Sequence, residues 1–141
     1  MDTNRIGLVR YRLEKANTKL TEASDNLMIG HLGLSITCSY YAIFSSIRAL
    51  LVLKDENPKT HEGAIKLFNK YFVKDNKFPA GTNKLIKDAK DIREQADYGD
   101  FFVIERKTAE AHLEHARRFV KRAEEILTES LLKGKNSNNK K

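Results

Sequence analysis

Five polar residues stand in apolar or helix-forming surroundings where they could bind or act on an anion: Arg48, His61, Arg93, Asp97 and Tyr98. Arg48 carries the single charge between residues 31 and 53. Because an unpaired buried charge is very costly, its guanidinium must be paired or reach solvent. It could form a salt bridge to Asp97 or another acid, or its fork of N–H donors could hold a phosphate.

The other four residues fall into two short motifs. Thr60 is a good N-cap, which places His61 in the first turn of the helix that follows. Backbone amides at such a helix end can receive an anion, although a simple cap with a surface histidine explains the same residues. Arg93 and Asp97 are four apart and can pair along one helix face, with Tyr98 next in the chain. A structural salt bridge at a helix end is the alternative.

Metal-ligating and nucleophilic motifs are not evident. The four histidines have no zinc spacing with Cys38, and the three-residue spacing of His112 and His115 is alone a weak metal signal. His112 lies on the apolar flank of its helix and fits the edge of a core better than a metal site. The sequence contains no phosphate-cradling glycine loop and no nucleophile elbow. We therefore expect no metal and no cofactor.

Hydrophobic periodicity predicts the helices that position these residues. The stretch from about residue 33 to 53 is apolar around nearly its whole circumference, which is typical of the central helix of a bundle. Apolar residues spaced alternately four and three apart predict a long helix over about 4–29 and another over about 106–132. Each of these two long helices thus has an apolar stripe, or seam, along one side. Two helices with matching seams, one near each end of the chain, are predicted to pack as an antiparallel pair in an all-α fold.

Two shorter helices complete the predicted bundle. Thr60 can cap one over about 61–74, and Thr82 can cap another that ends near Gly99, a residue that suits a left-handed C-terminal cap. The expected apolar face of this second helix is Leu85, Ala89, Ile92 and Ala96. Residues 101–104 are too short to assign by period, and we expect an extended segment over the bundle end.

Charge divides the chain into a helical domain over 1–132 and a disordered basic tail over 133–141. The tail holds four of the 26 basic residues and no acid, which leaves 22 basic against 19 acidic residues in the body. The body is therefore only weakly basic, and the tail could attract RNA or other anionic surfaces without specificity.

The sequence favours a cytoplasmic protein with no membrane span. The residues that follow Met1 are polar and lack the apolar region of a signal peptide, and Cys38 has no partner for an internal disulfide. The apolar span before Arg48 is shorter than the about 20 residues that a bilayer requires, and it includes several serines.

Three separated motifs resemble the HEPN domain, in particular the small stand-alone prokaryotic HEPN proteins, over about residues 5–130. The motifs are Ser39-Tyr40-Tyr41-Ala42-x-Phe44 with Arg48-Ala49-Leu50-Leu51, then Lys59-Thr60-His61-x-Gly63 with Leu67-Phe68, and Arg93-x-x-Ala96-Asp97-Tyr98-Gly99-Asp100.

The resemblance implies an up-and-down bundle of four to five helices, with long first, second and last helices, that commonly forms a homodimer. Many relatives are encoded beside a minimal nucleotidyltransferase in toxin–antitoxin or defence pairs. Active members are metal-independent ribonucleases whose motif is an arginine followed four to six residues later by a histidine. Here Arg93 would take the arginine position, and Tyr98 stands where the histidine belongs. A tyrosine, with a pKa of about 10, is a poor base at neutral pH.

The leading hypothesis is a helical protein that binds RNA or a nucleotide, a nucleotidyltransferase partner, or both. Arg93 and Arg48 would contact phosphate, Asp97 would orient Arg93, and Tyr98 and His61 would supply polar contacts. One alternative is a metal-independent endoribonuclease that uses Arg93 and Tyr98, with a contribution from His61. A second is a purely structural interaction bundle, in which both arginines sit in satisfied salt bridges with no cleft between them.

Overall fold

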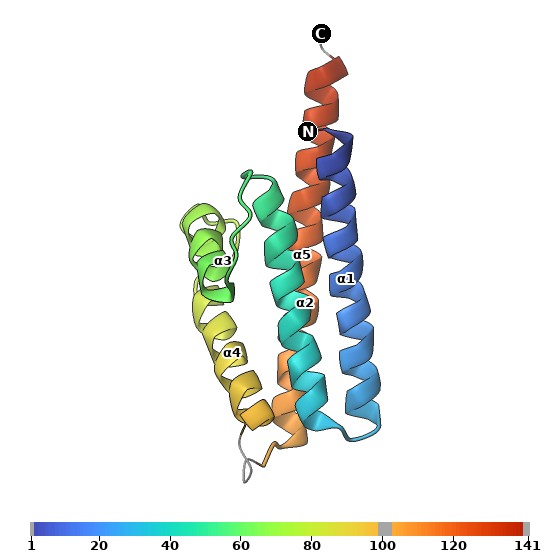
Figure 1. Cartoon of the computed structure of the whole chain (residues 1–141), viewed down its shortest axis with the longest axis vertical. Coiled ribbons are helices and arrows are strands. Elements are labelled where there is room, and N and C mark those ends of the chain that lie inside the picture. Colours follow the sequence, from blue (N-terminus) through green and yellow to red (C-terminus); the bar gives the residue numbers. More distant parts are fainter. Residues whose placement is uncertain (1, 99–102, 140–141) are drawn as a thin grey trace.

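The computed structural model describes residues 2–98 and 103–139, and every regular element in these ranges is helical. The side chains of Tyr98 and of residues 134–139 lie outside this description. The elements are α1 (Thr3–Met28), α2 (Leu32–Val52), α3 (His61–Phe68), the π-helical η1 (Asn69–Val73), α4 (Thr82–Tyr98) and α5 (Arg106–Asn139). The predicted all-α bundle with long first, second and last helices is confirmed (Figure 1).

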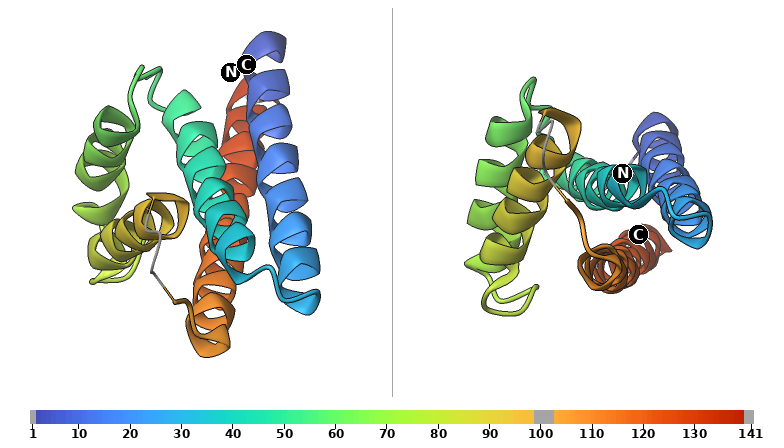
Figure 2. Two further views of the ribbon diagram at one scale, coloured as in Figure 1. Left: turned by 60° about the horizontal axis from the view of Figure 1, so that its bottom comes forward. Right: turned by 90° about the horizontal axis from the view of Figure 1, so that it is seen from below.

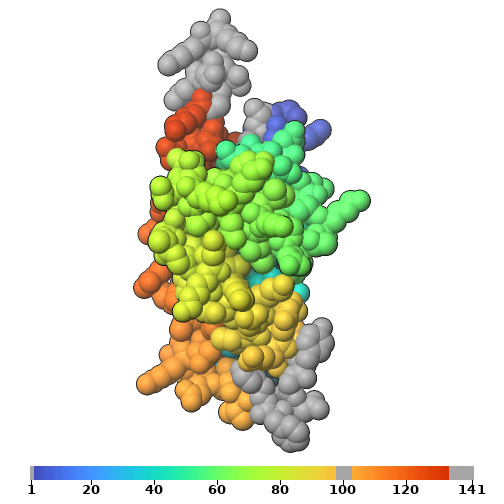
Figure 3. Space-filling model, turned by 90° about the vertical axis from the view of Figure 1, so that its left-hand side faces the viewer, coloured from blue at the N-terminus to red at the C-terminus, as the bar shows by residue number. Residues whose placement is uncertain are grey.

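Helix α2 lies at the centre of the molecule. Seen from below, α1 and α5 lie on one side of it, and α3, η1 and α4 lie on the other (Figure 2). Helices α1 and α5 run in opposite directions, as their matching seams predicted (Figure 1). Helices α3 and α4 form an outer layer that covers one side of the molecule (Figure 3). Helix α2 is therefore the wall shared by the two layers.

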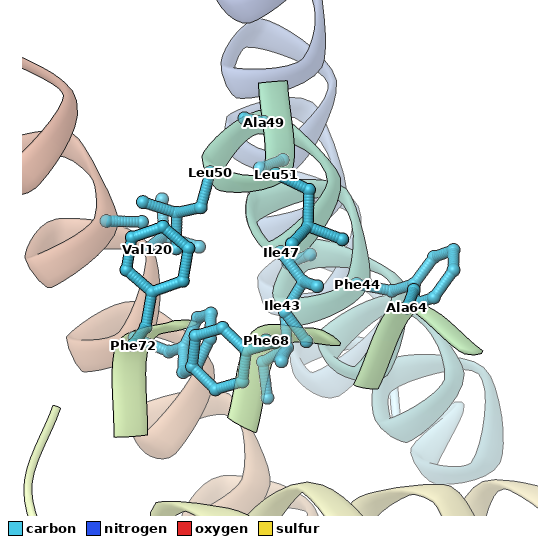
Figure 4. Close-up of a cluster of buried hydrophobic side chains, with 14 of the residues drawn as sticks. Ile43, Phe44, Ile47, Ala49, Leu50, Leu51, Ala64, Phe68, Phe72 and Val120 are labelled. Carbon is cyan, nitrogen blue, oxygen red and sulfur yellow. The ribbon is translucent and has the colours of Figure 1, made fainter. Parts of the chain in front are cut away.

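The core forms around α2 because its side chains are apolar on nearly every face. Its buried residues include Ile36, Tyr40, Ile43, Ile47 and Leu50, each at most 4% exposed. Figure 4 shows Phe68 and Phe72 beside Ile43, Ile47 and Val120, where α3, η1 and α5 meet α2. Burial of each large apolar side chain contributes about 1.5–3 kcal/mol, so this contact fixes the outer layer on α2.

The apolar length of α2 reflects this central position. The helix is long and apolar enough to cross a bilayer, but 78% of its most apolar window is buried inside the bundle. A helix that is already covered by protein on most sides is a core helix.

The helix ends follow their predicted caps in α1 and α3. Asp2 Oδ1 accepts from the backbone N–H of Arg5, and Thr60 Oγ1 accepts from the N–H of Gly63. Helix α5 continues to Asn139, past the predicted end near residue 132. The division into a bundle and a disordered basic tail stays a prediction.

Helix α4 differs from the prediction in register. Thr82 is its first helical residue, and its hydroxyl donates to the Pro79 carbonyl instead of capping the helix. Of the predicted apolar face, Ala89 is buried and Ile92 and Ala96 are half-buried, whereas Leu85 is 43% exposed and Ile86 is buried in its place. The buried stripe therefore runs through residues 82, 86 and 89, and the same spacing continues to Arg93.

The connection between α4 and α5 agrees with the prediction only in part. Gly99 and the first two residues of segment 101–104 lie outside the described residues. Val103 is 85% exposed, so it does not cover the bundle end as expected. Ile104 is half-buried, and its side chain lies against Gly33 of α2.

Candidate anion-binding site

The Arg93 side chain lies where α4 crosses α2, on the inward stripe of its helix. Its guanidinium carbon is 5.3 Å from the centre of the Tyr40 ring and 5.8 Å from that of Tyr41. Such cation–π contacts hold a guanidinium in a fixed place. The side chain is only 15% exposed, and its Nε is buried without a hydrogen-bond partner among the described residues.

Asp97 connects this arginine to α2. Its Oδ2 accepts from Arg93 Nη1 at 3.2 Å, and its Oδ1 accepts from the Thr37 hydroxyl at 3.3 Å. Burial acts to lower the pKa of Arg93, but the hydrogen bond to Asp97 and the nearby Tyr41 outweigh it, and the pKa is raised. The arginine is therefore a permanent positive charge, and the geometry allows Asp97 to orient it.

His61 projects from the first turn of α3 into the same region. Its Nδ1 is 3.0 Å from the Tyr40 hydroxyl, and its ring stacks on Phe44 with 3.9 Å between centroids. The pKa of His61 is lowered by burial first, and then by Arg93, Lys90 and Arg48. The imidazole is therefore predominantly neutral at pH 7, with positive charge in its surroundings.

The phenol of Tyr40 stays protonated beside this imidazole. Burial raises its pKa to about 12, although Arg93 acts in the opposite direction. A neutral phenol can donate to Nδ1 or accept from it, depending on which ring nitrogen of His61 carries the proton. In either case the hydrogen bond and the stacking fix the plane of the His61 ring.

Arg48 contacts a different partner from the acid that its sequence position suggested. Asp97 pairs with Arg93, so the suggested salt bridge from Arg48 to Asp97 is wrong. Instead Arg48 Nη2 donates to the side-chain oxygen of Asn57 at 3.3 Å. No carboxylate in the described ranges lies within salt-bridge distance of Arg48. The structural alternative, in which both arginines are satisfied by salt bridges, therefore does not hold for Arg48.

The structure brings together Arg93, Asp97 and His61, with Arg48 near enough to affect His61. It does not place the fifth candidate, because the side chain of Tyr98 lies outside the described residues.

Sequence reasoning missed the two tyrosines and the threonine of α2 that support this site. Tyr40 belongs to the apolar central helix and is only 1% exposed, but its hydroxyl also reaches His61. Thr37 and Tyr41 lie on the outer face of α2, toward α4. A cluster of hydroxyl-bearing residues at helical spacing in an apolar stretch was the available signal.

An apolar cavity lies in another part of the molecule, away from Arg93. A cavity of about 360 Å³ between α4 and α5 is lined by Phe78, Leu85, Ile86, Phe119 and other residues, none of them a predicted site residue. His112 and His115 lie nearby with their rings 6.3 Å apart. In the described part of the chain, no group of three potential metal ligands forms around them. The cavity is also lined by His115, Arg118 and Arg122, but none of these charged or titratable residues belongs to the Arg93 cluster.

Comparison with known proteins agrees with the helical architecture. Residues 9–126 match the family described as HEPN domain. A protein named "Putative toxin MJ0142" from Methanocaldococcus jannaschii is 34% identical over 91% of this chain and 88% of its own length. From the same organism, "Putative toxin MJ0605" is 37% identical over 69% of this chain and 72% of its length. A "UPF0332 protein" from Thermotoga maritima is 26% identical over 85% of this chain and 91% of its length.

Proposed function

This chain belongs to the HEPN domain family, and we propose that it is a toxin-type protein whose Arg93 site binds a phosphate group of RNA or of a nucleotide. The toxin names of two relatives support the biological class. The ligand class rests on the chemistry of the site.

The observation that carries the proposal is the guanidinium of Arg93, held over two tyrosine rings with only one of its edges paired to a carboxylate. Its Nε has no partner in the described part of the chain. Because Nε is fully buried, a phosphate oxygen would reach the guanidinium at Nη2, which makes no hydrogen bond to the described residues. Hydrogen bonds between guanidinium and phosphate are charge-assisted and strong. Lys90 and Arg48 add positive charge around His61.

The direct test is binding of labelled single-stranded RNA and of AMP, measured by fluorescence anisotropy and calorimetry. Arg93→Gln removes the charge and is expected to weaken binding about tenfold or more, which corresponds to loss of one charge-assisted contact. Arg118→Gln is the matched control, because Arg118 is 74% exposed on α5 and its one salt bridge within the described residues is to Glu114. The proposal fails if Arg93→Gln binds every tested ligand as tightly as the wild type.

A second function, metal-independent endoribonuclease activity, is favoured by the position of His61. When Nδ1–H donates to the Tyr40 oxygen, Nε2 keeps a lone pair that can accept a proton. His61 would take the proton of a ribose 2′-hydroxyl, whose oxygen then attacks the adjacent phosphorus. The bond to the 5′-oxygen breaks, that oxygen takes a proton from water, and a 2′,3′-cyclic phosphate remains. Arg93 would stabilise the charge that develops on the phosphate.

Incubation of the protein with RNA in EDTA tests this activity. We expect cleavage products with cyclic phosphate ends, and loss of cleavage in both His61→Gln and Arg93→Gln. Cleavage that survives His61→Gln would exclude the histidine as the base. A Tyr98→Phe variant examines the alternative in which Tyr98 takes part.

We further propose that the protein is a cytoplasmic homodimer restrained by a minimal nucleotidyltransferase partner. The support is the toxin class of the relatives, since a toxin needs a partner that keeps it inactive. Light scattering measures the molar mass and so tests for a dimer. Co-purification with the product of a neighbouring nucleotidyltransferase gene tests for binding of the partner.

A further inference from the structure

Two guanidinium groups share one neutral acceptor at the end of the bundle where α2 stops. Arg48 Nη2 and Arg12 Nη2 both donate to the side-chain oxygen of Asn57, at 3.3 and 3.4 Å. Arg12 also donates from Nη1 to the Arg48 carbonyl at 2.9 Å, which ties α1 to α2. The three residues come from α1, α2 and the connection to α3, so the fold alone brings them together.

The charge of this pair is not balanced within the described residues. No carboxylate in those ranges lies within salt-bridge distance of either arginine, and Arg48 Nε is buried without a hydrogen-bond partner. The pKa of Arg12 is lowered by burial and, next, by the positive charge of Arg48. Two like charges facing one amide oxygen repel each other, and an anion between them would remove that repulsion.

The pair is electrostatically continuous with the Arg93 site. Tyr40, Phe44 and Arg48 are four residues apart and lie on one face of α2. Arg93 lies over the ring of Tyr40, and His61 stacks on Phe44, one turn closer to Arg48. Arg93 of α4, Arg48 of α2 and Arg12 of α1 therefore follow one another along α2, and the lowered pKa of His61 agrees with positive charge in its surroundings. A ligand with a single phosphate can occupy only one end of this series.

We infer that Arg12, Arg48 and Asn57 form a second phosphate subsite, which holds a further phosphate of the same single-stranded RNA that Arg93 binds. The inference rests on the proposed function of the Arg93 site and specifies its ligand as a strand with several phosphates instead of a mononucleotide. Two guanidinium forks that converge on one point match the oxygens of a phosphodiester.

Asn57→Asp is the decisive variant. It places a carboxylate where the two guanidinium groups already point, and so it supplies the anion from the protein itself. We expect the melting temperature to rise by about 3 °C, as for a gain of a favourable charge pair. We also expect affinity for a single-stranded RNA decamer to fall about tenfold. A melting temperature above that of the wild type would show that the loss of binding does not come from misfolding.

The salt dependence of RNA binding reports how many phosphate contacts a variant loses. For single strands, the slope of log K against log salt changes by about 0.7 for each phosphate contact. We expect Asn57→Asp and Arg48→Gln each to lower the slope by about this amount. Arg10→Gln, which removes an exposed charge from the same helix α1 without touching Asn57, should leave the slope close to that of the wild type.

AMP distinguishes the two subsites. Its one phosphate should bind at Arg93, so Asn57→Asp should leave the affinity for AMP unchanged. If Asn57→Asp binds the RNA decamer with wild-type affinity and slope, the second subsite is refuted and the function of Arg93 stands. If neither the decamer nor AMP binds to the wild type, both the subsite and the proposed function fall.

Discussion

At the scale of single residues, the environment of His61 makes stability depend on pH. Burial and the neighbouring positive charges lower its pKa below the ordinary value of 6.5, and burial and His115 lower the pKa of His112 in the same way. The unfolded chain therefore binds more protons than the folded protein as the pH falls below about 6.5. Protonation of the unfolded state then costs the native state free energy, and stability is lost from about pH 6.5 down to the lowered pKa values.

We expect the free energy of unfolding to be smaller at pH 5 than at pH 7.5, and His61→Gln to reduce the difference. Urea denaturation at the two pH values measures it, with His31→Gln as the control, because His31 is exposed at the start of α2. A pH dependence that is the same in wild type and His61→Gln would show that His61 is not perturbed. NMR titration of the ring protons reports the pKa of His61 directly.

The reactivity of the Cys38 thiol can be predicted from its surroundings. Its sulfur is half-buried and lies 3.8 Å from Glu22 Oε2. Burial and the negative charge of Glu22 raise the pKa of the thiol, although Lys19 acts against them. Because the thiolate is the reactive form, we expect alkylation at pH 7.5 to be several-fold slower than for free cysteine.

Timed alkylation followed by mass spectrometry measures this rate, and the same reaction in guanidinium chloride gives the unfolded reference. Glu22→Gln should speed the folded-state reaction, since it removes the nearby carboxylate. A native rate equal to the unfolded one would contradict the expected environment.

At the scale of the helices, the register of α4 shows that an arginine can belong to the buried face of a helix. Periodicity alone placed Leu85 on the inner face together with Ala89. The structure buries Ile86 beside Ala89 instead, which brings Arg93 against Tyr40 and Tyr41. A pattern of apolar residues cannot predict that an arginine belongs to the buried stripe, because its aromatic partners are more than 50 residues away in the chain.

The adjacent residues Leu85 and Ile86 test this register. We expect Ile86→Ala to reduce the free energy of unfolding by about 2–4 kcal/mol, because it leaves a cavity at a side chain that is 1% exposed. Leu85→Ala should cost less than about 1 kcal/mol, because that side chain is 43% exposed. Chemical denaturation of both variants gives the comparison, and a reversed order would support the register predicted from periodicity.

The long helices were predictable for the opposite reason. The seams of α1 and α5 depend only on residues three and four apart, and Ala16, Ala23, Ala116 and Ala123 on them are all fully buried. The end of α2 was also predictable, because Pro58 follows it. What periodicity could not reveal is that Arg12 and Asn57, 45 residues apart, share a hydrogen bond. Contacts across helices depend on how the helices dock, which no local pattern records.

At the scale of the whole molecule, two layers share α2 (Figure 2). Arg93 of α4 and His61 of α3, which could act on a ligand, contact α2 where the outer layer meets it. The motif resemblance located Arg93, His61 and Arg48 along the chain. Their convergence depends on the path from α2 through α3 to α4, so the family resemblance could imply it, whereas residue types and spacing could not predict it. We expect the basic tail to attract RNA as well, and this contribution must be distinguished from that of the site.

Removal of residues 134–141 makes that distinction. The deletion takes away three lysines, Lys135, Lys140 and Lys141, and leaves all the core residues that the structure describes in place. We expect an almost unchanged melting temperature, a loss of RNA affinity of about threefold or less, and a smaller salt slope, because tail contacts are electrostatic and non-specific. The effect of Arg93→Gln should be the same in the full-length and the truncated protein, since independent sites contribute additively. If the truncated protein no longer responds to Arg93→Gln, RNA binding resides in the tail, and the Arg93 cluster is a structural contact between α2 and α4.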